Sequence, residues 1–170
     1  MNKISVKLLR ELTDYDSITG IMTWRKRSLK HFAAKQDWIT WNKRFAGKEC
    51  GTLKDGYKQM RIKGVYFYVH RAAFAHHHGR WPKFEIDHID QNPLNNCIRN
   101  LRDTKENSKN KGKNSRNKSG YTGVSWHSGA KKWMAYVGKQ YLGLFEDPEL
   151  AGFVCELTRD KLGYHPNHGK

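Results

Sequence analysis

The chain of 170 residues is long enough for one ordinary domain or two small ones. It carries 32 Lys and Arg against 16 Asp and Glu, and this formal net charge of +16 favours a polyanionic partner, most often nucleic acid. A membrane span and a membrane-surface partner are not expected, because there is no run of about 18 apolar residues and no basic helix with a wide apolar face. We also expect no signal peptide.

The three cysteines, Cys50, Cys97 and Cys155, are odd in number, far apart and outside any Cys-x-x-Cys pattern. That spacing makes a structural zinc site unexpected, and it fits the reducing interior of a cell. We therefore expect an intracellular protein.

Apolar residues at helical spacing predict a short amphipathic helix over residues 4–12. Residues 14–20 read as a turn, and a strand is predicted over residues 21–24. The mixed charges and aromatic side chains of residues 25–50 predict a loop with one short helical or irregular piece. We expect these aromatic residues to pack on a small core, and contact with DNA is the alternative.

Two tight-turn signals, Asp55-Gly56 and Lys63-Gly64, frame the next segment. Residues 57–62 between them alternate in polarity, and a β-branched and aromatic run follows at residues 65–69. Together these patterns predict a small antiparallel meander.

Residues 69–78 predict a helix that ends at Gly79. On this helix, Arg71 either contacts a phosphate or the active site, or is an exposed salt-bridge partner, and the sequence leaves both open. The three consecutive histidines, residues 76–78, point in different directions around a regular helix, so they cannot bind one ion together. We interpret them as surface residues.

Polar side chains crowd the stretch from Glu85 to Asn110. A short apolar piece, residues 84–86, ends in the adjacent pair Asp87-His88, and a loop rich in Asn and Asp follows. An acid beside a histidine suits a metal ligand next to a general base, because a neutral imidazole takes up a proton near pH 7. A plain turn is the alternative, since Asn and Asp side chains bond their own backbone.

Four strings stand in order along this stretch: Asp87-His88, Asn95-Asn96, Asn100-Leu101-Arg102 and Glu106-Asn107. In this order they resemble the HNH nucleases of phages and mobile introns, whose active site is a ββα-metal finger of two short strands around a long loop, followed by one helix. The resemblance implies hydrolysis of a DNA phosphodiester that leaves a 3′ hydroxyl and a 5′ phosphate. It also suggests a homing or phage-exclusion role, in the cytoplasm of a bacterial host if the chain comes from a phage.

The resemblance also implies roles for single residues. His88 is the expected general base, and Asp87 is an expected metal ligand. Asn100 is expected to order the loop, and Asn107 to be the second metal ligand. Asn110, one helical turn further on, is the alternative ligand. The implied cofactor is a divalent ion, Mg²⁺ with Mn²⁺ as the alternative.

Residues 105–119 carry six cations, one anion and no apolar residue, so they cannot contribute to a core. Their first part is predicted to complete the helix of the motif, and residues 111–119 to form a basic linker. We expect the linker to lie along DNA phosphates, which adds affinity that falls with salt and carries little sequence information.

The last 50 residues predict a second unit. Residues 123–126, 132–137 and 140–145 read as three short strands, and Asp147-Pro148-Glu149 starts a helix with Asp147 as its cap. The helix carries an expected apolar stripe towards the sheet, made of Leu150, Phe153, Val154, Leu157 and Leu162. One helix on one face leaves the other face of the sheet open.

The strings Tyr121-Thr-Gly-Val, Lys132-Trp133, Tyr141-Leu-Gly-Leu-Phe145 and the Asp-Pro-Glu helix resemble the ethylene-response-factor type of DNA-binding domain. That family lays its sheet in the major groove of DNA. Alternation along the middle strand puts Trp133, Ala135 and Val137 against the helix, and Met134 and Tyr136 on the open face. The positions that match the contacts of the family are Ser125, His127, Tyr136, Lys139 and Tyr141. Protection of a thin sheet is the alternative role of Tyr136 and Tyr141.

These patterns predict an α+β protein: a ββα-metal finger nuclease core with a small antiparallel meander, and a three-stranded sheet packed on one helix. The predicted parts are a nuclease region at residues 1–110, with the motif at about 84–110, the linker 111–119 and a DNA-binding domain at 120–166. Beyond the sheet, the basic residues expected to contact DNA are Arg71, Arg99, Arg102, Lys105, Lys109, Lys111, Lys113, Arg116 and Lys118.

The predicted function is that of a metal-dependent HNH DNA endonuclease acting on double-stranded DNA. It is expected to be a monomer or a homodimer. The sequence does not decide between a nick and a double-strand break as the product of cleavage. One alternative is a DNA-binding regulator with an inactive nuclease motif. A basic RNA-binding protein is another, although the major groove of A-form RNA is too narrow to accept a sheet.

Overall fold

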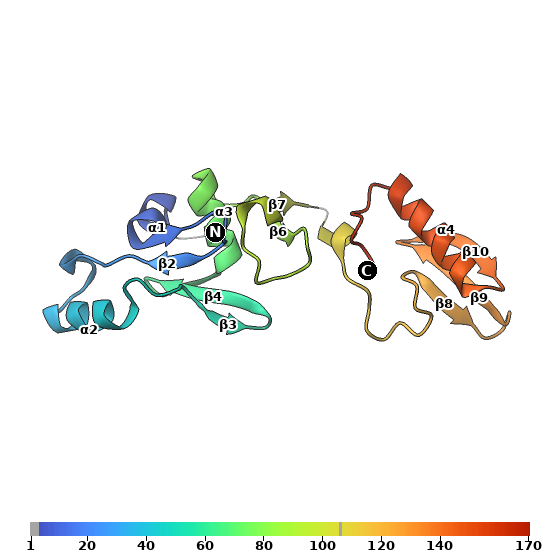
Figure 1. Ribbon diagram of the computed structural model, residues 1–170, viewed down its shortest axis with the longest axis horizontal. Coiled ribbons are helices and arrows are strands. Elements are labelled where there is room, and N and C mark those ends of the chain that lie inside the picture. Colours follow the sequence, from blue (N-terminus) through green and yellow to red (C-terminus); the bar gives the residue numbers. More distant parts are fainter. Residues whose placement is uncertain (1–3, 106) are drawn as a thin grey trace. The chain divides into compact units, whose positions relative to one another are not determined.

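The structure is a computed structural model that describes residues 4–105 and 107–170, with the side chains of residues 107 and 108 outside the description. The chain divides into two compact units, Met1–Lys105 and Glu106–Lys170 (Figure 1). Four α-helices and small antiparallel sheets make up the described residues, which confirms the predicted α+β class. In this part of the chain, no helix is long and apolar enough to cross a membrane.

The first unit begins with helix α1 (Val6–Leu12), in agreement with the predicted N-terminal helix. The Ser5 side chain accepts a hydrogen bond from the Leu8 N–H at 3.2 Å, a cap that stabilises a helix by about 1 kcal/mol. Leu9 and Leu12 are buried and face the core of the unit, so the apolar side of the helix is the one that packs.

A two-stranded ribbon follows, formed by β1 (Thr13–Tyr15) and β2 (Met22–Trp24). The predicted turn over residues 14–20 is wrong at its start, because its first residues pair with β2. The Asp16 carboxylate closes the actual turn by accepting hydrogen bonds from a backbone N–H and a hydroxyl of the turn itself. The turn therefore begins at Asp16, directly after β1.

Helix α2 (Lys35–Phe45) occupies much of the stretch that was predicted to be mainly loop, and a single 3-10 turn, η1 (Leu29–His31), precedes it. The prediction of one short helical piece is therefore too short. None of the residues of α2 is fully buried, and a helix without a wide apolar face leaves a weak periodic signal. The expected packing on the core is confirmed for Trp41 and Phe45, and the centroid of the Trp41 ring lies 5.7 Å from that of Trp24.

The predicted meander is a three-stranded sheet of β3 (Thr52–Lys54), β4 (Tyr57–Ile62) and β5 (Val65–Tyr68), in that order. At each of its turns, two consecutive residues have positive φ angles, Asp55-Gly56 and Lys63-Gly64. This is the conformation of hairpin turns that match the twist of their strands. The turn signals in the sequence are confirmed.

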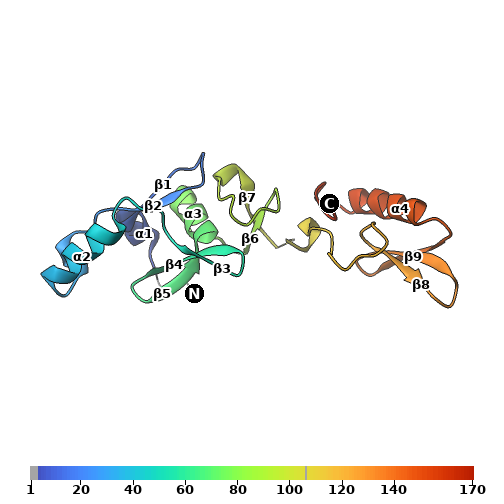
Figure 2. The ribbon, with the colours of Figure 1, turned by 60° about the horizontal axis from the view of Figure 1, so that its bottom comes forward.

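Helix α3 (Val69–His78) follows the sheet directly and ends, as predicted, at Gly79, whose φ of 72° lies in the left-handed region. Figure 2 shows α3 beside β4, and the helix packs against α1 and the strands β4 and β5. Ala72, Ala73 and Ala75 are completely buried, so the helix approaches its neighbours closely.

The three consecutive histidines lie at the end of α3. His77 and His78 are exposed, as expected. His76 is half-buried, and its Nε2–H donates to the Thr13 carbonyl at 3.2 Å. The interpretation as surface residues is therefore wrong for His76, because the first residue of β1 lies against this turn of the helix.

Two short antiparallel strands complete the first unit, β6 (Glu85–His88) and β7 (Leu101–Thr104). The long loop between them ends in a 3-10 turn, η2 (Ile98–Asn100), so the predicted pair of strands around a loop is present. The predicted helix after the second strand is wrong: the described residues form only a 3-10 turn, η3 (Asn107–Asn110). This segment has no apolar residue with which an α-helix could pack, and packing supplies most of the stability of helices in proteins.

The second unit is a three-stranded antiparallel sheet with one helix, as predicted. Helix α4 (Pro148–Lys161) begins after Asp147, whose carboxylate accepts a hydrogen bond from the Glu149 N–H at 2.9 Å. Residues 111–119 consist of turns and irregular backbone. The strands lie in the order β10-β9-β8 and are β8 (Val124–His127), β9 (Lys132–Val137) and β10 (Gln140–Phe145).

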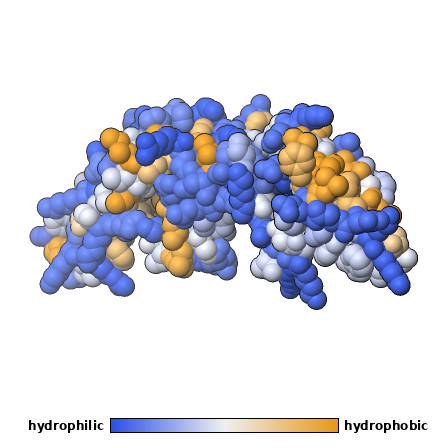
Figure 3. All heavy atoms as spheres, turned by 45° about the vertical axis from the view of Figure 1, so that its right-hand side comes forward, coloured by the Kyte–Doolittle hydropathy of each residue, from blue (hydrophilic) through white to orange (hydrophobic). Residues whose placement is uncertain are grey.

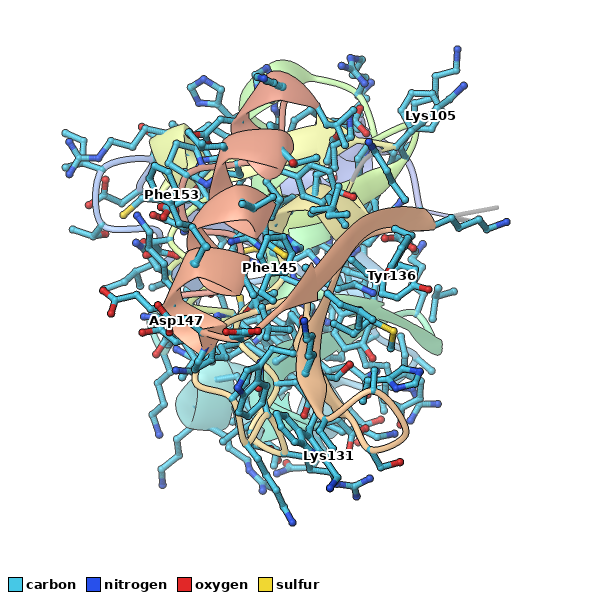
Figure 4. The ribbon with its side chains drawn as sticks, turned by 90° about the vertical axis from the view of Figure 1, so that its right-hand side faces the viewer. Lys105, Lys131, Tyr136, Phe145, Asp147 and Phe153 are labelled. Atoms are coloured by element: carbon cyan, nitrogen blue, oxygen red, sulfur yellow. The ribbon has the colours of Figure 1, made fainter. Side chains whose placement is uncertain are left out.

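The alternation predicted along β9 is confirmed. Ala135 and Val137 are buried in the small core of this unit, and Tyr136 between them is exposed. Figure 4 shows Tyr136 on the sheet and Phe153 on the outer side of α4, at opposite sides of the unit. The sheet therefore has one face that packs on the helix and one open face.

The predicted apolar stripe of α4 does not face the sheet. Leu150, Phe153, Leu157 and Leu162 are between 44% and 56% exposed, and Figure 3 shows apolar side chains gathered on this unit. The residues that α4 buries are small: Ala151, Gly152 and Cys155. One of these small residues packs closely against the segment before β8: a Cβ atom built on Gly152 would lie 2.4 Å from a ring carbon of Tyr121.

From this close packing we predict that Gly152→Ala destabilises the protein by about 1–3 kcal/mol, although alanine is the better helix former. The added methyl group collides with the Tyr121 ring. Chemical denaturation of the full chain measures the free energy of unfolding. Gly129→Ala is the matched control, because its methyl group meets only the edge of the His127 ring at 3.4 Å. An equal loss in both variants would contradict the packing argument.

Candidate active site

Asp87 is the most buried acid of the motif, with 4% of its surface exposed. The register of β6 and β7 places Arg102 directly opposite it. A guanidinium nitrogen of Arg102 donates to the Asp87 carboxylate at 2.5 Å, so the two charges form an ion pair. This pairing compensates a carboxylate that would otherwise be costly to remove from water.

His88 is the neighbour of Asp87 at the end of β6 and is also buried, at 6% exposed. Its Nε2–H donates to the Asn96 side-chain oxygen at 3.2 Å, which makes Nδ1 the nitrogen that carries the lone pair. Burial lowers the pKa of His88, although Asn96 and the nearby carboxylates act in the opposite direction. The imidazole is therefore neutral at pH 7, as a general base must be.

The loop between β6 and β7 is held by Asn100, the residue predicted to order it. The Asn100 amide donates to the Asp90 carboxylate at 2.9 Å and to the Asn95 carbonyl at 2.8 Å, and its oxygen accepts from the Asp90 N–H at 3.0 Å. The Asn96 carbonyl accepts from the Tyr15 hydroxyl at 2.6 Å, which fixes the loop to β1. These bonds place the Asn96 side chain beside His88.

His70, at the start of α3, is a site residue that sequence reasoning missed. It is 7% exposed, and its ring lies 5.1 Å from the His88 ring in an edge-on arrangement. Tyr68 stacks on it, and Tyr57 lies 5.4 Å away and also contacts His88. The sequence feature that could have indicated His70 is its position: it is a polar residue at the junction of a strand and a helix, next to Arg71.

The segment that leads into β6 is fixed by two charged side chains. The Arg71 guanidinium donates to the Phe84 carbonyl at 2.9 Å and to the Pro82 carbonyl at 3.3 Å. The Asp103 carboxylate accepts from the backbone N–H groups of Lys83 and Phe84. Arg71 is thus half-buried and holds the backbone before β6, rather than being an exposed salt-bridge partner, and its contact with a phosphate stays a prediction.

The donors predicted for a metal ion are carboxylate and amide oxygens, the type of ligand that Mg²⁺ prefers. The carboxylate of Asp87 fits this role, because it is buried and already lies beside a positive charge, the guanidinium of Arg102. The side chain of Asn107 lies outside the described residues, and the buried Asn110 lies in η3, in the second unit. The approach of either residue to Asp87 stays a prediction. Across the described ranges, 4–105 and 107–170, no group of three or more His, Cys, Asp or Glu could hold a metal ion.

The basic residues predicted to contact DNA fall into two groups. Arg71 and Arg102 are engaged inside the first unit, whereas Arg99 and Lys105 are exposed on it. In the second unit, the Lys109 side chain donates to the Leu162 carbonyl at 3.1 Å. Exposed residues of the second unit are Lys111, Lys113, Arg116 and Lys118, together with all five of the sheet positions, Ser125, His127, Tyr136, Lys139 and Tyr141.

Burial of His70 gives a pH prediction. Burial, together with His88 and Arg71, lowers the pKa of His70 to about 3, against about 6.5 in an unfolded chain. Between these values the unfolded chain binds a proton that the folded chain excludes, so stability falls as the pH falls below 6.5. The free energy of unfolding of the wild type falls between pH 7 and pH 5. We predict that this fall is smaller by about 2 kcal/mol in His70→Phe, which lacks the titrating group.

Urea denaturation of the full chain at pH 7 and pH 5 measures this loss. His77→Phe is the control, because His77 is exposed on the same helix and its replacement is expected to leave the pH dependence unchanged. If His70→Phe keeps the pH dependence of the wild type, proton exclusion by this residue is not its cause.

Two comparisons with known proteins found a match to this chain. The profile of the HNH endonuclease family matches residues 67–108, which include Asp87, His88, Asn100 and Arg102. Protein 3.8 of Escherichia phage T7 is 44% identical over 120 residues, which cover 66% of this chain and 94% of that protein. No solved structure matches the chain. The chain therefore belongs to the family of phage T7 Protein 3.8, and its residues 67–108 match the model of the HNH endonuclease family.

Proposed function

We propose that the chain is a metal-dependent DNA endonuclease that hydrolyses phosphodiester bonds, with the catalytic site on β6 and a DNA-binding surface on the second unit. The observation that carries the proposal is the adjacent pair on β6: a buried carboxylate, Asp87, beside a neutral imidazole, His88, within the region that matches the HNH family. The net charge of +16 supports a nucleic-acid substrate.

In this proposal, His88 is the general base. Its Nε2–H is donated to Asn96, so Nδ1 takes the proton from the attacking water. Asn100 keeps the loop, and with it Asn96, in place. Asp87 holds one divalent ion, Mg²⁺ or alternatively Mn²⁺, and the second ligand is the predicted Asn107, with Asn110 as the alternative. When bound, the ion supplies stabilisation of the charge that develops on the scissile phosphate and its leaving oxygen.

The products are expected to be a 3′ hydroxyl and a 5′ phosphate. One such site cuts one strand, so a double-strand break requires a homodimer or two successive events. A site-specific, homing-type enzyme of a phage, acting in the cytoplasm of its host, is the biological role we propose.

The second unit is proposed to bind double-stranded DNA through the open face of its sheet, in the manner of the ethylene-response-factor domains. The rings of Tyr136 and Tyr141 lie 5.2 Å apart on this face, and Lys139 is exposed in the turn between their strands. An exposed aromatic pair with a neighbouring cation is a surface that suits contact with DNA bases and phosphates. Residues 111–119 add exposed cations that suit the phosphate backbone.

We predict that His88→Ala lowers the rate of DNA cleavage by a factor of about 10²–10⁴, the usual contribution of a general base. Conversion of supercoiled plasmid and phage DNA, with Mg²⁺ or Mn²⁺ and with a chelator, measures the rate, and mapping of the ends identifies the products. His77→Ala is the control, because it removes an exposed histidine of the same unit.

Cleavage by His88→Ala within tenfold of the wild type would exclude His88 as the base. If neither protein cuts any DNA while both bind it, the chain is instead a DNA-binding regulator with an inactive nuclease motif.

We further predict that the double substitution Tyr136→Ala and Tyr141→Ala weakens binding to duplex DNA at least tenfold, which is about 1.4 kcal/mol. The two rings leave the proposed contact face while the core residues beneath them are unchanged. Fluorescence anisotropy with a labelled duplex at fixed salt measures the affinity. Phe153→Ala, on the outer side of α4, is the matched aromatic control, and an equal loss in that variant would show that the sheet face is not the contact surface.

A further inference from the structure

The ion pair between Asp87 and Arg102 occupies the group on which the proposed metal site depends. The Asp87 side chain is 4% exposed, and its Oδ2 atom lies 2.5 Å from an Nη atom of Arg102. The two residues are direct partners in the register of β6 and β7, so the contact follows from strand pairing. In the protein without DNA or metal, the positive charge beside the Asp87 carboxylate is therefore the guanidinium of Arg102.

The two members of the pair are held very differently. Asp87 is fixed in the strand and buried, whereas the Arg102 side chain is 40% exposed. The described residues provide no hydrogen-bond partner for the buried Nε atom of Arg102, so the guanidinium lacks the two-pronged contact that makes such pairs strong. The arginine can therefore move towards solvent while the carboxylate stays.

A divalent cation and a guanidinium cannot both sit at one carboxylate without strong repulsion, because like charges in a poorly hydrated site are little screened. An incoming ion must displace the Arg102 side chain. A DNA phosphate is the anion that can receive the displaced guanidinium, since Arg pairs well with phosphate oxygens. The exposed end of Arg102 gives it a path to such a phosphate.

We propose that Arg102 is the resident counter-ion of Asp87 in the free protein and that it exchanges places with the divalent ion when DNA binds. This proposal rests on the proposed function. The divalent ion takes the carboxylate of Asp87, and Arg102 moves to a phosphate of the substrate. Metal affinity is consequently weak in the free protein and increases on DNA, and by linkage the ion increases the affinity for DNA by the same factor.

Phosphate oxygens of DNA are suitable additional ligands for a hard cation. A substrate that both supplies such ligands and removes the competing guanidinium explains why the ion and the DNA would bind together.

The test measures binding of Mn²⁺ by electron paramagnetic resonance, in the full chain with His88→Ala in every sample to prevent cleavage. Titrations are made without DNA and with a duplex, and the signal of Mn²⁺ with the duplex alone is subtracted. The expected result is that DNA tightens Mn²⁺ binding at least tenfold. Asp87→Asn is expected to abolish this site, which identifies the ion that is measured.

Arg102→Met then isolates the arginine. We expect it to tighten Mn²⁺ binding to the free protein about tenfold and to reduce the further gain on DNA. Arg61→Met is the matched control for the loss of one positive charge, because Arg61 is exposed in the same unit and is not among the predicted DNA contacts. Circular dichroism checks folding, and Arg102→Lys, which keeps the charge, is expected to behave like the wild type.

Two outcomes overturn the exchange. One is an equal affinity for Mn²⁺ with and without DNA in the protein that retains Arg102, a result that needs no Arg102 variant to fold. The other is a folded Arg102→Met that binds Mn²⁺ no more tightly than Arg61→Met. In both cases Mn²⁺ still binds at Asp87, and the proposed nuclease function survives. Absence of Mn²⁺ binding under all conditions would overturn the metal-dependent function as well.

Discussion

Charge balance around one buried carboxylate sets the conditions for the whole candidate site. Asp87 lies on a strand of four residues, and the partner strand is equally short. A carboxylate so far removed from water needs a counter-charge, and the register of the two strands brings Arg102 to it. The pairing of two short strands thus determines which charges meet, besides closing a loop. His88, the next residue, is buried by the same arrangement and is neutral for that reason.

Polar side chains that bond the backbone hold this site in place. Asp103 and Arg71 fix the chain before β6, and Asn100 fixes the loop after it. The buried residues of this loop, Asn96 and Asn100, are polar, so apolar burial alone does not order it. Local side-chain to backbone bonds take over that task. The many Asn and Asp residues of the loop are both turn formers and the framework of the candidate site.

The parts of the fold that could be predicted are those with a local cause. Gly79 ends α3 through its own backbone conformation, the Asp55-Gly56 turn is specified by two residues, and Asp147 caps α4 through one side chain. The pair Asp87-His88 could be predicted as a candidate for a similar reason, because the proposed chemistry involves two neighbouring residues. Each of these features is complete within a few positions of the sequence.

The parts that could not be predicted depend on partners far away in the chain. The apolar character of the α4 stripe predicts that it packs on the sheet, but the residues that α4 buries are Ala151, Gly152 and Cys155, and Gly152 packs closely against Tyr121. His70 lies on α3 and contacts His88 on β6, and the periodicity of the sequence does not predict a contact between two different elements. The helix expected after β7 lacks an apolar surface to pack on, a requirement that a resemblance to a family does not test.

The turn between β3 and β4 has a consequence for the chemistry of a different sheet. Tyr57 is the first residue after the Asp55-Gly56 turn, and its ring contacts both His70 and His88. Deleting one residue from this turn would shift the strand by one position and bring the neighbouring Lys58 to the place of the ring. An ammonium group would then replace an aromatic wall beside the imidazole. Natural and engineered length variation should therefore be far rarer at this hairpin tip than at other exposed turns, even though no residue of the tip itself takes part in the reaction.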